Sequence, residues 1–105
     1  MSDELPKALR GLKASSEELW AAYSKLGEAA AQAGPLDAKS RRLVKLALAI
    51  GCASEGAVHS HVRRARAEGC CDEEIHQVAI LAITTLGLPR AMAARTWISD
   101  ILDKD

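Results

Sequence analysis

Apolar side chains recur at spacings of three and four residues along most of the chain, and no stretch alternates between apolar and polar residues. Leu19, Tyr23 and Leu26 form one such stripe between polar neighbours. This spacing places apolar residues on one face of an α-helix, whereas a half-buried strand would alternate with a period of two. The pattern predicts an all-α fold, a compact bundle of about six helices.

Capping residues and glycines divide the pattern into its helices. Ser15 or Ser16 precedes two acidic residues, which is typical of a helix start, and the Gly34–Pro35 pair interrupts the pattern. Gly51, Gly69 and Gly87 follow later apolar stretches and favour helix ends. We therefore expect helices over residues 5–12, 16–33, 38–51, 56–68, 72–87 and 89–102.

The third of these helices is predicted to be central. It is apolar almost all round, as expected of a helix that packs on several sides. Lys45 interrupts it, one turn after Arg42. A lysine there either extends to solvent along its methylene chain or pairs with an acid, and the two cations together could bind a carboxylate.

Length and composition predict a single domain over residues 1–105 that buries surface by self-association. The chain is 49% hydrophobic but has no Phe, so Ala, Leu, Ile and Val supply most of its apolar mass. A domain this small buries only part of its apolar surface, and alanine contributes little area. We expect a homo-oligomer.

The charge balance excludes the classes of protein that depend on a strong electrostatic field. The formal net charge is zero, so nothing favours nucleic acid as a partner. The apolar run Leu46–Ile50 is too short to span a membrane, and the acidic start, Met1–Glu4, does not resemble a secretory signal. We expect a cytoplasmic protein without membrane segments, in which Cys52, Cys70 and Cys71 form no disulfide framework.

The order and spacing of several short motifs resemble the carboxymuconolactone decarboxylase and alkylhydroperoxidase D superfamily. These motifs are Arg41–Ala47 on the central helix, then His61, Gly69, the Glu73–Ile75 start and the Gly87–Pro89 turn. The resemblance implies a small helical fold that assembles into trimers or hexamers, with active sites near subunit contacts. In the decarboxylase branch of the superfamily, the resemblance also implies an enzyme that acts on a small molecule without a metal or cofactor.

The chain departs from the peroxidase branch at the positions that carry its redox chemistry. There the histidine lies four residues after the second cysteine of a Cys-x-x-Cys pair, which places Ser54 and Ala57 at the two thiol positions here. The branch's glutamate on the central helix falls at Arg42. A dithiol cycle needs a thiolate and a resolving thiol, so peroxidase activity by the family mechanism is not expected.

His61 is the leading candidate for acid/base catalysis, because imidazole titrates near neutral pH. A hydrogen-bonded core histidine is the alternative interpretation of the same residue. His59 points about 200° away from His61 on an ideal helix and pairs in register with Glu55, which indicates a surface contact. Glu55 and His59 complete the candidate catalytic set, and Arg42 and Lys45 are the candidate substrate-binding residues.

Three functions remain open at this point. The first is a cofactor-free lyase or isomerase acting on a small anionic substrate. The second is a thiol-dependent alkylhydroperoxidase-like antioxidant enzyme relying on Cys52 or on Cys70 and Cys71, and the third is a non-catalytic helical oligomer. A metal site built from Glu55, His59 and His61 is an alternative. If all three residues lie on one continuous helix, the two imidazoles point in different directions and cannot bind the same ion. We therefore expect no metal.

Overall fold

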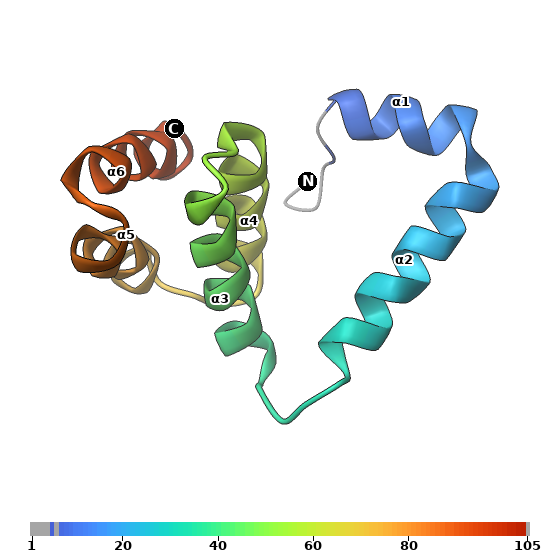
Figure 1. The fold of residues 1–105 in the computed structure, drawn as a ribbon, viewed down its shortest axis with the longest axis horizontal. Coiled ribbons are helices and arrows are strands. Elements are labelled where there is room, and N and C mark those ends of the chain that lie inside the picture. The colour runs from blue at the N-terminus through green and yellow to red at the C-terminus, as the bar shows by residue number, and fades with distance from the viewer. Residues whose placement is uncertain (1–4, 6, 105) are drawn as a thin grey trace. The chain divides into compact units, whose positions relative to one another are not determined.

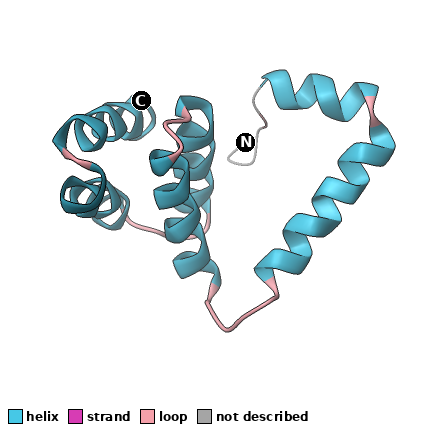
Figure 2. Ribbon diagram, viewed as in Figure 1, coloured by secondary structure: helices cyan, strands magenta, loops and turns pink. Residues whose placement is uncertain are grey.

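Every regular element in the described part of the chain, Leu5 and residues 7–104 of the computed structural model, is an α-helix (Figure 2). The all-α prediction is confirmed for these residues. The helices are α1 (Lys7–Ser15), α2 (Glu17–Ala31), α3 (Ala38–Gly51), α4 (Glu55–Ala67), α5 (Asp72–Leu86) and α6 (Leu88–Leu102).

The helices divide into two units at the boundary between Asp37 and Ala38. In the N-terminal unit α1 contacts α2, and none of the described residues of either helix is buried. Ser16 is the N-cap of α2, as the sequence indicates, and the rings of Trp20 and Tyr23 stack obliquely with centroids 5.6 Å apart. A single domain over the whole chain stays a prediction.

The C-terminal unit consists of α3 to α6 around one apolar core (Figure 1). Helix α3 packs on α4 and α5, and α6 packs on α4 and α5. Each of the four helices contributes at least one large side chain that is fully enclosed; these are Leu46, Ile50, Val58, Val62, Ile75 and Ile98. Because α4 lies against both α3 and α6, its polar residues have neighbours on two different helices.

The expected boundaries agree best in this four-helix unit. Helix α3 has the predicted limits, and α4 begins one residue early because Ser54 is its N-cap, whose Oγ accepts a hydrogen bond from the Ala57 N–H over 3.3 Å. In the other unit α1 continues to Ser15 and α2 ends at Ala31, so both predicted ends are wrong by two or three residues. No glycine or proline directly follows α1, and α2 ends three residues before Gly34, so the local pattern left these ends poorly defined.

Helices α3 and α4 end in the same way but with different residues. After α4, Gly69 has a φ of 96°, its N–H bonds to the Arg66 carbonyl, and the Cys70 N–H bonds to the Ala65 carbonyl. After α3, Ala53 takes the equivalent position with a φ of 56°. This left-handed conformation suits glycine and is strained for alanine. Hydrogen bonds from the Ala53 and Ser54 N–H groups to the Ile50 and Ala49 carbonyls hold the turn to the start of α4 despite this strain.

None of the helices among the described residues is both long and apolar enough to cross a bilayer.

Candidate functional site

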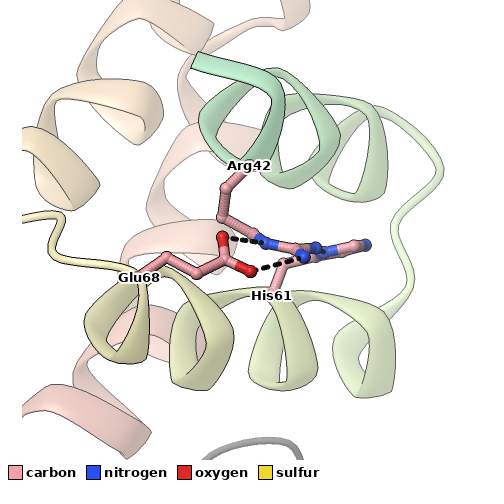
Figure 3. A network of polar contacts seen from close by, with 3 residues as sticks. All are labelled: Arg42, His61 and Glu68. Carbon is pink, nitrogen blue, oxygen red and sulfur yellow. Dashed lines mark hydrogen bonds and ion pairs between the residues drawn. The ribbon is translucent and has the colours of Figure 1, made fainter. Parts of the chain in front are cut away.

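Arg42 on α3 reaches across to α4 and joins two of its side chains, His61 and Glu68 (Figure 3). Its Nη1 lies 2.8 Å from Nδ1 of His61. Its Nε and Nη2 donate to the two carboxylate oxygens of Glu68, each over 3.0 Å. One guanidinium therefore satisfies a carboxylate in the paired geometry that arginine favours and still has a donor for the imidazole.

The contact with Arg42 determines which nitrogen of His61 carries the proton. A guanidinium is a donor only, so Nδ1 of His61 must accept the hydrogen bond. The neutral ring then carries its proton on Nε2. Nε2–H is therefore the ring group left to donate a hydrogen bond to another molecule.

The surroundings of His61 strongly favour its uncharged form. Burial, followed in importance by the positive charges of Arg42, Lys45 and Arg64, lowers the pKa of His61 from 6.5 to about 4. Glu68 opposes them and raises the pKa. At neutral pH His61 is therefore an uncharged imidazole in a positive field.

Glu68 is part of this network, and the sequence analysis did not identify it. Its carboxyl has a pKa below the usual range, chiefly because Arg42 donates hydrogen bonds to it. Glu68 follows His61 by seven residues, which returns to the same face of a helix after two turns. Two features of the sequence indicate this carboxylate. One is the seven-residue spacing from His61, and the other is Arg42 at the position where the resembled family has a glutamate, because an arginine there needs an acidic partner.

Lys45, the second expected substrate-binding residue, has a different environment from Arg42. Its side chain is exposed, while that of Arg42 is only 14% exposed. Lys45 is nevertheless near enough to lower the pKa of His61. It offers a cation at the rim of the site, whereas Arg42 is engaged by Glu68 and His61.

The structure places Glu55 and His59 apart from the Arg42–His61–Glu68 network. Nε2 of His59 lies 3.0 Å from Oδ2 of Asp100 on α6 and 4.0 Å from Oε2 of Glu55. The three residues expected to form one catalytic set are thus divided between two faces of α4, as the helical angle between His59 and His61 requires.

No thiol occupies the start of α4, where the resembled peroxidase branch has its cysteine pair. Ser54 and Ala57 are the N-cap of α4 and the residue whose N–H it binds. All three cysteines are free, and Cys70 is buried with a pKa raised by desolvation and by Glu74. A raised pKa disfavours the thiolate that peroxide reduction requires.

An apolar groove of about 720 Å³ runs between α3 and α5. Its walls include Val44 and Leu48 from α3 and Leu81 and Leu86 from α5, all four of which are exposed. Arg42 and His61 do not line it. The imidazole is therefore not part of this groove, and the mainly apolar walls offer little for acid/base chemistry.

Comparison with known proteins gives one match. The sequence model of the carboxymuconolactone decarboxylase family matches residues 17–100. Neither the curated proteins nor the solved structures give a match.

Proposed function

The chain belongs to the carboxymuconolactone decarboxylase family, and we propose that it is a cofactor-free lyase or isomerase that acts on a small carboxylate through His61. Family membership supports the general class of protein. The particular chemistry is argued from the geometry around the imidazole.

The observation that carries the proposal is the positive field around an uncharged histidine. Arg42, Lys45 and Arg64 all lower the pKa of His61, to about 4 in total with burial. The same charges attract an anion, and a bound carboxylate would offset them. Binding of the substrate therefore offsets part of the lowering of the His61 pKa, while the neutral ring keeps the Nε2–H that it donates to the substrate.

The proton that takes part is the one on Nε2, which the neutral ring can donate in a hydrogen bond. In an isomerisation, Nε2–H of His61 donates to the substrate carbonyl oxygen and stabilises the enolate that forms when water removes a proton from the neighbouring carbon; water then returns a proton at another carbon. In a decarboxylation, the electrons of the broken carbon–carbon bond pass to the same oxygen as carbon dioxide leaves, and water protonates the resulting enolate. In both cases the ring keeps its proton and no electrons are gained or lost, so no redox partner is needed.

The polar partners have separate tasks in this scheme. Arg42 is a positioning residue, because its donors hold Nδ1 of His61 and the Glu68 carboxylate. Lys45 binds the substrate carboxylate, since it is exposed and close enough to influence His61 electrostatically. Arg64 adds to the field that retains the anion.

The proposed assembly is a trimer or hexamer. Large apolar side chains are exposed along α3, α5 and α6: Val44, Leu48, Ile80, Leu81, Ile83, Leu86, Leu88 and Met92. A monomer seldom leaves a contiguous patch of this kind uncovered. Copies of the chain packed over the α3–α5 groove would bury it.

A substrate panel tests the proposed activity. Carboxylated lactones and 2- or 3-oxo acids are incubated with the protein in deuterated water, and carbon–deuterium exchange or carbon dioxide release is measured. We expect turnover of at least one compound and a loss of about 10² on His61→Ala, which removes the Nε2–H donor to the substrate oxygen. His76→Ala, on α5, is the matched control and should retain turnover.

Two results would contradict the proposal. One is turnover that His61→Ala leaves unchanged. The other is absence of both exchange and ligand-induced change at His61 across the panel, which would favour the non-catalytic oligomer. Robust peroxide consumption that disappears when Cys52, Cys70 and Cys71 are replaced together would instead favour the thiol-dependent alternative.

A further inference from the structure

Glu55, His59 and Asp100 bring three potential metal ligands together where α4 meets α6. One carboxylate oxygen of Glu55, one of Asp100 and a ring nitrogen of His59 all lie within 4.8 Å of one another. We propose that these residues bind a divalent transition-metal ion, with Zn²⁺ the best fit, at a site distinct from His61.

The backbone supplies most of the required arrangement. Glu55 and His59 are one turn apart on α4, so their side chains project from the same face. Asp100 comes from α6, which packs directly against α4 in the four-helix unit. Two of the three ligands are thus separated by 41 positions in sequence and meet only through tertiary packing.

The distances suit a metal ion after a small side-chain adjustment. A tetrahedral zinc with bonds of about 2.1 Å separates its ligand atoms by about 3.4 Å. The His59–Asp100 separation is 3.0 Å and the His59–Glu55 separation is 4.0 Å. The Glu55 oxygen must approach Nε2 of His59 by about the difference between 4.0 and 3.4 Å. Its separation from the Asp100 oxygen, which is at most 4.8 Å, must shorten to the same value of about 3.4 Å, and the exposed side chain of Glu55 leaves room for this adjustment.

The chemistry of the donors favours a transition metal over calcium or magnesium. Two carboxylates balance the charge of a divalent cation, and an imidazole nitrogen is preferred by Zn²⁺ and its neighbours but not by the hard cations. His59 is largely shielded, with 21% of its side chain exposed, while the two carboxylates are more open. Three protein ligands leave a coordination position for water, as in metal sites that are open to substrates.

A simple ion pair is the competing explanation for the same geometry. The His59–Asp100 contact could join α4 to α6 without any metal. An ion pair would use Asp100 but would not depend on Glu55, whose oxygen lies at 4.0 Å. A metal site requires all three residues, so Glu55→Gln separates the two explanations.

Cobalt substitution tests the site directly. Purified protein, treated first with a chelator, is titrated with Co²⁺ and followed by its visible absorption and by calorimetry. We expect one ion per chain, and a loss of affinity of about tenfold or more for each of Glu55→Gln, His59→Gln and Asp100→Asn. His61→Gln and His76→Gln are the matched controls and should bind Co²⁺ as the parent does.

Three further results would support or contradict the metal site. A rise in the thermal midpoint with Zn²⁺ that disappears in Glu55→Gln would support it, because an ion that binds only the folded state stabilises that state. Undiminished binding in His59→Gln would overturn it. Thiolate-to-cobalt charge-transfer bands would also overturn it, since they would place the ion on a cysteine. Circular dichroism of the variants without metal shows that they are folded.

Discussion

The guanidinium of Arg42 donates to Nδ1 of His61 from a distance of 2.8 Å, so the two cation-forming side chains share a hydrogen bond only while the imidazole is neutral. Protonation of Nδ1 would replace this bond with repulsion between two positive charges. Arg42 thereby fixes the tautomer of His61, lowers its pKa and links it to Glu68.

Replacement of Arg42 should raise the pKa of His61. After burial, the charge of Arg42 is the strongest influence that lowers the pKa of His61, and Arg42→Gln removes it. The pKa should therefore rise from about 4, but it should stay below 6.5 because the ring remains partly buried. Nuclear magnetic resonance of the ring protons measures this value. Arg95→Gln on α6 is the control: Arg95 is not among the charges that chiefly lower the pKa of His61, so this variant should leave that pKa unchanged. If the pKa of His61 is also unchanged in Arg42→Gln, the proposed network is wrong.

Acid should destabilise the protein in the pH range between the two pKa values of His61. The unfolded chain binds a proton below about 6.5, whereas the folded chain resists protonation until about 4. The unfolded state therefore binds more protons in this window, and the free energy of unfolding falls as pH decreases from 6.5 to 4. Denaturant titrations at several pH values measure the slope.

The variant His61→Gln isolates this contribution. It should flatten the slope between pH 6.5 and pH 4. The further loss below pH 4.5 that arises from the lowered pKa of Glu68 should persist in it. An identical slope in parent and variant would mean that His61 titrates normally in the folded protein.

Lys45→Met should weaken substrate binding more than catalysis. A charge-assisted hydrogen bond to the substrate carboxylate is lost, which corresponds to a KM higher by about tenfold or more. The kcat should change less, because Arg42 and not Lys45 contacts the imidazole. Steady-state kinetics on the substrate found in the panel measures both, with Lys25→Met on α2 as the control. A fall in kcat at constant KM would assign Lys45 to the chemical step instead.

The two left-handed helix ends should respond oppositely to exchange of alanine and glycine. Ala53→Gly relieves a strained φ of 56° and should raise the free energy of unfolding by about 0.5–1 kcal/mol. Gly69→Ala introduces the same strain at a φ of 96° and should lower it by about 1 kcal/mol, although no atom obstructs the new Cβ. Urea denaturation at one fixed protein concentration measures both changes.

Light scattering at micromolar concentration should give the mass of a trimer or hexamer. Leu81→Glu introduces a charge into the exposed apolar groove and should shift the mass toward the monomer. Arg95→Glu, an equally exposed change on α6 outside the groove, is its control. A monomer mass for the parent protein would refute the assembly.

Local patterning was sufficient to locate the helices of the C-terminal unit. Apolar spacing reports which face a helix buries, and Gly51, Gly69 and Gly87 mark ends within a few residues. The same periodicity directed His59 and His61 to different faces of α4, and the match of residues 17–100 to the family model agrees with the resemblance drawn from short motifs. The ends of α1 and α2 were less accurate because no glycine or proline directly follows α1 and because α2 ends before the Gly34–Pro35 pair is reached.

Tertiary packing decided which side chains meet across helices. Glu68 joins Arg42 over a separation of 26 residues, and Asp100 joins His59 over 41. No local pattern encodes such pairs, because they depend on the distance and angle at which α3 and α6 pack on α4. The lowered pKa of His61 likewise depends on tertiary packing. It results from burial and from charges on α3 and α4, and the spacing of residues within one helix determines neither of these.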